Sequence, residues 1–370
     1  MSSRPVGVGF IGAGNVLPAY LQVLDRLVPR GLAWEGPICA RQRETWPELR
    51  RRRPGATLVD DPRAVVESEV DVVVVITPPS SHAELAGLAL SVDKHVVVEK
   101  PLAEDRAAAE ELVGLAAARG RHLLAAPFVQ LSPTFRALWT VVSDGAVGRI
   151  HSARGLYGNA GSHWTTWYHS GGPGPLAEAG IYNLKSLTAL LGPVDEVLAA
   201  ETLAVPVRHA GGVEVESPDP DVSHVVLRHT GGALSSVVSS QAIQRYRRPA
   251  LELYGTEGTA NLLGDDWDPR GFEIWRNATG MWEEREPIEP TWLWADGLRE
   301  VVEAVHEERD PLHSLEHDLH LLDVIAAARV SAEMSRGVLV PSGFAPLNLR
   351  YELPLGVEHL HDHTRPASEQ

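Results

Sequence analysis

The sequence predicts an α/β protein with two domains, the first a doubly wound parallel sheet and the second built on a large, mostly antiparallel open sheet. Three observations lead to this prediction. The chain has 370 residues, which exceeds the usual size of one domain and suggests units of roughly 120 and 200 residues. Strand-like and helix-like segments alternate up to about residue 125. After Pro127 the pattern changes to short strands separated by Gly, Pro and Asp turns.

The first strand is the apolar run Val6–Ile11, which leads directly into Gly12-Ala13-Gly14-Asn15. A helix is expected to start near Val16. Glycines let the backbone approach a pyrophosphate without a Cβ in the way, and the helix start offers free amides and a positive dipole end. The segment therefore predicts a phosphate cradle.

The rest of the first domain follows the same alternation of strand and helix. The run His95–Val98 ends in Glu99-Lys100-Pro101, which places a lysine at the carboxyl end of a buried strand, where open α/β sheets bind ligands. Further strands are expected at 38–40, 71–76 and 123–125, and helices at 82–90 and 107–118.

The second domain is expected to begin after residue 126 with a helix and then a series of strands. We predict domain boundaries at 1–126, 127–353 and 354–370, the last being a polar tail. Strands are expected at 150–158, 222–228, 233–239, 251–254 and 272–275, and helices at 133–142, 296–308 and 315–335. Such a sheet leaves one face free to pack on a partner.

Composition excludes several classes of function. The net charge of −16 argues against general affinity for nucleic acid or an anionic membrane. No apolar run approaches the roughly 20 residues that span a bilayer, and the first residues do not resemble a signal peptide. Cys39 is the only cysteine, so no intramolecular disulfide can form. We expect an unprocessed cytoplasmic protein.

The residues after the second strand bear on the choice of dinucleotide. An acidic residue there usually binds the ribose 2′-hydroxyl of NAD, but this chain has Ala40, followed by Arg41 and Arg43. Arginine suits a 2′-phosphate, so NADP is favoured over NAD. The alternative is that both arginines are solvated residues at the start of the next helix.

Three segments together resemble the Gfo/Idh/MocA oxidoreductase family. They are the glycine turn, Thr77-Pro78-Pro79-Ser80-Ser81-His82 and Glu99-Lys100-Pro101, with further similarity at 145–148 and 337–341. The resemblance implies an N-terminal Rossmann domain and a C-terminal α/β domain whose open sheet commonly forms homodimers or homotetramers. It also implies oxidation of a sugar or cyclitol hydroxyl, or reduction of the matching ketone.

The resemblance also assigns residues to the cofactor. Leu17 departs from the fingerprint, because a third glycine normally permits close packing of helix on strand at that position. Glu99 is expected at the nicotinamide half or its ribose. The implied cofactor residues are Gly12, Gly14, Asn15, Val16, Leu17, Thr77, Pro78, Pro79, His82, Glu99 and Lys100.

Residues 171–183 resemble the family's glycine-rich loop leading into the catalytic helix. Many members have Asp and His where this chain has Glu178 and Tyr182, and Pro173 is a further departure. Tyr182 is the predicted acid–base group for the carbinol proton. Since a phenol titrates near pH 10, a neighbouring cation is needed to lower its pKa, and Lys100 is the expected neighbour.

Four more residues are candidates for substrate contact. Lys185, three residues after Tyr182, would add a second positive charge, unless it is a surface lysine. Glu178 would accept hydrogen bonds from substrate hydroxyls, the alternative being a carboxylate that interacts with its own helix dipole. His163 and Trp164 precede the glycine loop and would form part of a pocket wall.

Three histidines, His313, His317 and His320, together with Asp318, raise the question of a metal site. Their spacing does not define tetrahedral ligation, and the resemblance places them on a packing helix. No metal is predicted.

The predicted function is an NAD(P)-dependent oxidoreductase acting on CH–OH groups of a sugar, cyclitol or related polyhydroxylated substrate. Two rivals remain open. One is a catalytically silent regulatory protein that only binds the cofactor, which the departures at Leu17, Pro173 and Glu178 would suit. The other is redox-assisted glycoside cleavage or elimination, in which the NAD stays bound.

Overall fold

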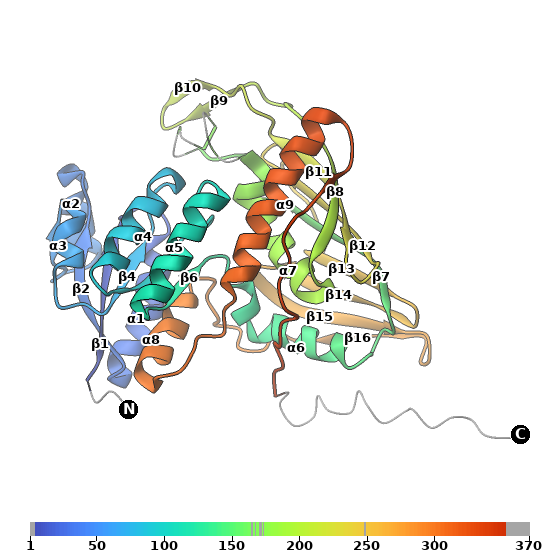
Figure 1. Ribbon diagram of the computed structural model, residues 1–370, viewed down its shortest axis with the longest axis horizontal. Coiled ribbons are helices and arrows are strands. Elements are labelled where there is room, and N and C mark those ends of the chain that lie inside the picture. The colour runs from blue at the N-terminus through green and yellow to red at the C-terminus, as the bar shows by residue number, and fades with distance from the viewer. Residues whose placement is uncertain are drawn as a thin grey trace, which may run out of the picture.

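The first unit is a six-stranded parallel sheet with helices on both faces, as the alternating pattern predicts (Figure 1). The computed structural model describes residues 4–163, 166, 168–169, 172, 174–247 and 249–352. The strand order β3-β2-β1-β4-β5-β6 reverses direction beside β1, which places a ligand crevice at the carboxyl ends of β1 and β4. The strands are β1 Val6–Ile11, β2 Ala33–Cys39, β3 Leu58–Val59, β4 Val72–Val75, β5 His95–Val98 and β6 Leu123–Ala125.

Alternate residues of the central strand β4 feed two different cores. Val72 and Val74 pack with α1, whereas Val73 and Val75 pack with α3, α4 and α5. Both faces of the sheet are thus covered, which explains why the strands are continuously apolar. The helices are α1 Leu17–Leu27, α2 Trp46–Arg52, α3 Pro62–Val66, α4 His82–Ser91 and α5 Arg106–Arg119, with 3₁₀ turns at Val28–Arg30, Arg43–Thr45 and Pro79–Ser81.

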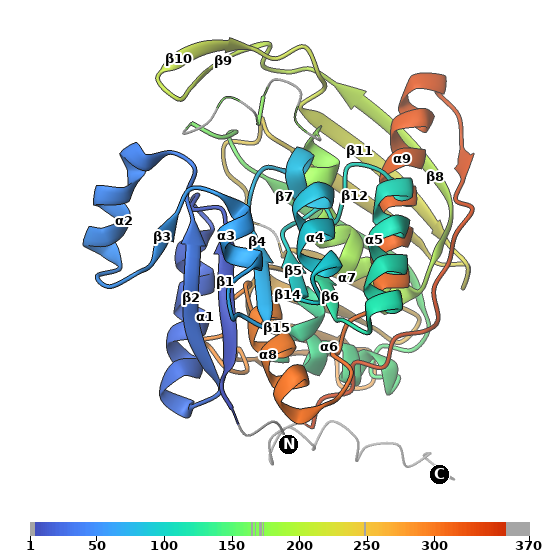
Figure 2. The same ribbon diagram turned by 60° about the vertical axis from the view of Figure 1, so that its left-hand side comes forward.

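One helix that lies late in the sequence completes this first unit. Helix α8, Gly297–Glu307, lies beside α1 in both views and buries Leu298, Val301 and Val302 in the core formed by α1 and the sheet (Figures 1 and 2). The two units are therefore interleaved along the chain, because a helix from the carboxyl-terminal half covers the six-stranded parallel sheet.

The second unit is a nine-stranded sheet in the order β16-β15-β14-β13-β7-β12-β11-β8-β17. β12 pairs with β7 in parallel, and the other neighbouring strands pair antiparallel. The strands are β7 Ile150–Gly158, β8 Val194–Thr202, β11 Val222–His229, β12 Leu234–Ser240, β13 Leu251–Gly255, β14 Gly258–Asp265, β15 Asp268–Arg276, β16 Met281–Arg285 and β17 Val338–Leu339.

Helices cover one face of this sheet and leave the other open. α6, α7 and α9 contribute to the core on the inner face, and α9 also packs on α5, so that it stands between the two units (Figure 1). On the open face Leu198, Val226 and Leu234 are 43–49% exposed. The elements are α6 Pro133–Ser143, α7 Ile181–Leu191, α9 Leu315–Met334, a 3₁₀ turn Val129–Leu131, a π-helical turn Leu176–Gly180, and a hairpin of β9 Val207–Ala210 with β10 Val213–Glu216.

The fold class and most elements predicted from the sequence are confirmed, with ends shifted by a few residues. The expectations did not include α2, α3, β3, β8, β14, β16, β17 or the β9–β10 hairpin. Cys39 is buried in β2. The tail 354–370 lies outside the described residues. Among the residues that the structure describes, we find no helix able to cross a bilayer.

Two glycines of the turn after β1 have different structural roles, which predicts different stabilities for their alanine variants. Gly12 has φ +114°, and a Cβ there would lie 2.7 Å from the carbonyl oxygen of Ile76, whereas a Cβ on Gly14 would meet nothing within 4 Å. We expect Gly12→Ala to lower the free energy of unfolding by about 2 kcal/mol or more. Gly14→Ala should change it by less than about 0.5 kcal/mol. Denaturant unfolding without added nucleotide measures both, and equal losses would contradict this assignment.

Candidate functional site

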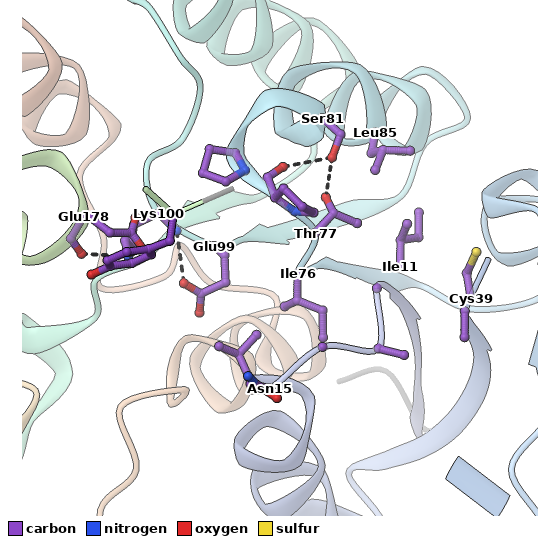
Figure 3. A pocket seen from close by; sticks show the side chains of 18 of the residues that line it. Ile11, Asn15, Cys39, Ile76, Thr77, Ser81, Leu85, Glu99, Lys100 and Glu178 are labelled. Atoms are coloured by element: carbon purple, nitrogen blue, oxygen red, sulfur yellow. Dashed lines mark hydrogen bonds and ion pairs between the residues drawn. The ribbon is translucent and has the colours of Figure 1, made fainter. Parts of the chain in front are cut away.

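A cavity of about 890 Å³ opens between the two units. Ile11 and Cys39 lie at one end and Lys100 and Glu178 at the other, with Glu99 between them (Figure 3). The cavity therefore runs from the glycine turn, past the ends of β4 and β5, to the start of α7. Its lining includes Gly12, Ala13, Gly14, Asn15, Val16, Arg41, Thr77, Pro78, Pro79, Glu99, Lys100, Tyr157, Asn159, Tyr168, Glu178, Tyr182, Trp267 and Trp294.

The glycine turn forms the floor at one end of the cavity. Gly14 faces open space, so a side chain there would fill the hollow. The N-cap of α1, Val16, supplies no side-chain hydrogen bond, which leaves the helix start available to an anion. Leu17, expected among the cofactor residues, is instead 2% exposed and packs in the core behind the turn.

The two arginines after β2 behave differently. Arg41 lines the cavity, and its guanidinium has no hydrogen bond or ion pair with any described residue. Arg43 does not line it; its guanidinium pairs with Asp60 at 2.5 Å and stacks over the Trp46 ring. Of the two candidates, the structure brings only Arg41 to the cavity.

The loop after β4 reaches the cavity through Thr77, Pro78 and Pro79. His82 is fully buried and does not line it. Its ring nitrogens contact the carbonyl oxygens of Pro101 at 2.8 Å and Thr77 at 2.9 Å. His82 therefore joins the loops that follow β4 and β5, and its place is behind the wall of the cavity.

Glu99 is held at the centre of the cavity by a tyrosine that the sequence did not single out. The hydroxyl of Tyr20, on α1, donates to Glu99 Oε1 at 2.8 Å. Burial, and then the Glu99 carboxylate, raises the pKa of Tyr20, so this phenol stays a hydrogen-bond donor.

Lys100 bridges the two units of the protein. Its Nζ lies 2.7 Å from Glu178 Oε1 and donates to the Glu178 carbonyl oxygen at 2.7 Å (Figure 3). The two side chains are only 12% and 9% exposed. The other carboxylate oxygen of Glu178, Oε2, is buried and has no hydrogen-bond partner among the described residues. The cavity wall thus carries a fixed ammonium and an acceptor with free capacity.

Tyr182 lies on the same wall, and its ring stacks on Tyr157 with centroids 5.9 Å apart. Burial raises the pKa of Tyr182 well above its usual value, and Glu99 raises it further. The net shift is therefore upward, opposite to the lowering that the sequence led us to expect from Lys100. Glu178 already neutralises the ammonium, and itself raises the pKa of the phenol.

The π-helical turn before α7 is shaped by close contact with β12. Ser239 Oγ donates to the carbonyl oxygen of Pro175 at 2.7 Å. A Cβ on Gly180 would lie 2.8 Å from Leu176 Cδ1 and 3.0 Å from Ser239 Cβ, so glycine favours this close approach. Glu178 lies within this turn, and both its carbonyl oxygen and its carboxylate contact the Lys100 ammonium.

Helix α7 is held in place by buried polar contacts. Asn183 Nδ2 and Ser186 Oγ donate to Asp266 Oδ2 at 3.0 and 3.1 Å. Lys185 is fully buried and pairs with Asp318 of α9. Lys185 therefore does not reach the cavity, and the expectation that it supplies a second charge there is corrected: its face of α7 packs on α9.

The histidines of α9 and the segment before it serve packing. His313 pairs with Asp318 at 2.5 Å, His317 contacts Thr188 Oγ1 at 2.6 Å, and His320 Nε2 accepts from the Val194 amide at 2.9 Å. Among the described residues no group of three or more His, Cys, Asp or Glu side chains is arranged to hold a metal.

The expected pocket wall at 163–169 is only partly described. His163 is exposed and does not line the cavity, whereas Tyr168 does. Trp164 and Pro173 lie outside the described residues. Tyr157, Asn159 and Trp267 line the cavity, and Tyr20 and Asp266 support it, but none of these residues was predicted from the sequence. Tyr20 lies within α1, and the others are polar or aromatic residues near strand ends.

Two models of one protein family match the chain. The NAD-binding Rossmann model of the Gfo/Idh/MocA oxidoreductase family matches residues 6–126, and the Gfo/Idh/MocA C-terminal domain model matches residues 135–261. Together they cover about two thirds of the chain.

Individual relatives agree with this match. Trans-1,2-dihydrobenzene-1,2-diol dehydrogenase of Bos taurus is 27% identical over 271 residues, covering 70% of this chain and 75% of that protein. The crystal structure of an oxidoreductase domain protein from Kribbella flavida has a TM-score of 0.80 at 23% identity, covering 92% of this chain and all of that one. Levoglucosan dehydrogenase in complex with NADH and levoglucosan has the same TM-score and coverage at 20% identity. These two structures share the fold.

The buried carboxyl under α7 predicts a pH dependence of stability. Burial raises the pKa of Asp266 from 3.8 to about 7. The folded state therefore binds a proton on Asp266 more tightly than the unfolded state does. Protonation of Asp266 stabilises the fold fully below about pH 4, and this stabilisation is lost as the pH rises through about 7. Across this pH range we expect the free energy of unfolding of the wild type to fall by up to roughly 4 kcal/mol relative to that of Asp266→Asn.

Denaturant unfolding of both proteins at pH 4.5 and pH 8 measures most of this difference. Asp268→Asn, which changes an exposed carboxylate two residues away, is the matched control. Parallel pH curves for wild type and Asp266→Asn would contradict the prediction.

Proposed function

Because the chain belongs to the Gfo/Idh/MocA oxidoreductase family, we propose that it transfers a hydride between NAD(P) and a CH–OH or ketone carbon of a sugar, cyclitol or similar polyhydroxylated molecule. One observation carries this proposal. The glycine turn, the Lys100 ammonium and the Tyr182 phenol all line one cavity, although they come from both units of the protein. Relatives named as diol and levoglucosan dehydrogenases support the substrate class.

The cavity fits a dinucleotide. Gly12, Gly14 and the uncapped start of α1 would hold the pyrophosphate, with Asn15 and Val16 beside it. Thr77, Pro78 and Pro79 would line the nicotinamide half, and Glu99 would contact it. Bound NAD(P) supplies the hydride donor or acceptor.

Side chains of the protein would stabilise the charge on the substrate oxygen and transfer its proton. Tyr182, held as a neutral phenol, donates a hydrogen bond to that oxygen. The Lys100 ammonium donates a second one and stabilises negative charge that develops there. Since Lys100 contacts Glu178, it is also placed to pass a proton between the substrate oxygen and the carboxylate. Glu178 Oε2 would accept from a neighbouring substrate hydroxyl.

The open face of the second sheet supports assembly. Leu198, Val226 and Leu234 expose apolar side chains there on three adjacent strands. We assign this face to a homodimer or homotetramer contact, because contiguous exposed apolar surface on a folded protein commonly marks an interface.

The cofactor residues predict a preference for NADP. We expect Arg41→Ala to weaken NADP binding about tenfold and to leave NAD binding nearly unchanged, because the guanidinium would meet only the 2′-phosphate. Arg43→Ala, whose partner is Asp60, should have a smaller effect. Fluorescence titration with NADPH and NADH measures both; equal losses for the two cofactors would remove Arg41 from this role.

The catalytic assignment predicts distinct effects of two variants. Lys100→Met should lower kcat by about 10³-fold and Tyr182→Phe by about 10²-fold, because each removes a donor to the reacting oxygen. Since the pKa of Tyr182 is raised, reduction of the keto substrate should show no ionisation of this phenol between pH 6 and 9.

The measurement is a screen of sugars, cyclitols and their keto forms with NAD and NADP, following absorbance of the reduced nicotinamide. Far-UV circular dichroism and denaturant unfolding of each variant serve as the folding control, because Lys100 is itself among the expected cofactor residues. Full turnover by either variant would exclude its residue from the mechanism. Binding without turnover of any compound would favour a silent cofactor-binding protein, and retained cofactor without net NADH would favour redox-assisted elimination.

A further inference from the structure

A second hollow of about 570 Å³ adjoins the cavity and takes no part in the proposed hydride transfer. The two share Tyr157, Asn159 and Trp267 as common walls. Tyr157 also stacks on Tyr182, so the second hollow begins one aromatic ring away from the proposed reaction centre. A molecule that reacts at Tyr182 has a continuation of its binding site on the far side of Tyr157 and Trp267.

Two arginines that line the second hollow have no partner among the described residues. Arg245 and Arg247, on the segment between β12 and β13, both line it and are exposed. Neither guanidinium has a hydrogen bond or ion pair within the part of the chain that the structure describes, although most other arginines of the protein pair with carboxylates. Two unpaired guanidinium groups in one hollow favour an anionic ligand.

The acidic side chains nearby do not cancel these charges. Asp265 also lines the hollow, but one of its oxygens accepts from the Tyr246 hydroxyl at 2.5 Å. Asp266 is fully buried and turns to Asn183 and Ser186 under α7. The described part of the hollow therefore carries two cations against one carboxylate. In a chain of net charge −16, a local cationic site is what an anionic ligand requires.

We propose that this second hollow binds a carboxylate or phosphate group of the substrate, so that the protein acts on an anionic sugar or cyclitol derivative. This inference rests on the proposed function and deepens it. The polyhydroxylated part lies against Lys100, Glu178 and Tyr182, while the anionic group extends past Tyr157 to Arg245 and Arg247. Planar guanidinium groups pair bidentately with both kinds of anion.

The test compares matched neutral and anionic compounds. The probes are D-glucose against D-glucuronate and D-glucose 6-phosphate, and myo-inositol against myo-inositol 1-phosphate, each with NAD and NADP. We expect kcat/KM to be at least tenfold higher for one anionic class than for its neutral parent. The carboxylate and phosphate arms distinguish the two sources of charge. The preference should shrink as salt is raised, because exposed charges are screened.

Variants of the two arginines test the site itself. Arg245→Gln and Arg247→Gln should each lower the ratio of anionic to neutral kcat/KM by about tenfold. Arg245→Lys should lower this ratio by less, because lysine keeps the positive charge but cannot pair bidentately with the anion. Arg63→Gln, an exposed arginine on α3, is the matched control and should leave the ratio unchanged. Equal kcat/KM for neutral and anionic compounds would overturn the inference and leave the proposed function standing.

Calorimetry decides the inference if none of these compounds turns over. The NADP-loaded protein should bind an anionic probe, and the Arg245→Gln/Arg247→Gln double variant should not. Absence of binding by wild type would overturn the anionic site. Absence of turnover by any sugar, cyclitol or keto form in the wider screen would count against the proposed function instead.

Discussion

The contact between Lys100 and Glu178 is the constraint on which the rest of the site depends. It joins the end of β5 in the first sheet to the π-helical turn before α7 in the second unit, through a carbonyl and a carboxylate oxygen. Because both side chains are nearly buried, removing one partner would leave the other as an uncompensated charge. The interleaved packing of α8 on the first sheet and of α9 between the units holds the two halves in this register.

This contact also sets the electrostatics of the cavity. Glu178 pairs with the ammonium, and burial together with Glu99 keeps the Tyr182 phenol protonated. The site therefore presents two donors and one buried acceptor, the unpartnered Oε2 of Glu178, to a polyhydroxylated molecule. Two separate buried contacts of α7, one with Asp266 and one between Lys185 and Asp318, keep these groups in place.

Much of the fold was predictable from sequence because its signals are local. Each of three sequence features indicates an element or its end within a few residues: the apolar runs, the glycine turn and Glu99-Lys100-Pro101. The site was only partly predictable, because its partners are brought together by tertiary packing. Spacing from Tyr182 suggested Lys185 for the cavity, but spacing does not say which face of α7 meets α9. Likewise Tyr20, Tyr157 and Asp266 come from distant segments, and the contact between Glu178 and Lys100 joins residues 78 positions apart.

The most direct test of this account is a crystal structure of the protein with NAD(P) bound. The account predicts the pyrophosphate at Gly12–Val16 and the nicotinamide ring beside Glu99, with Lys100 and Tyr182 facing one side of that ring. A dinucleotide bound outside this cavity, or a nicotinamide ring that Lys100 and Tyr182 do not both face, would contradict it.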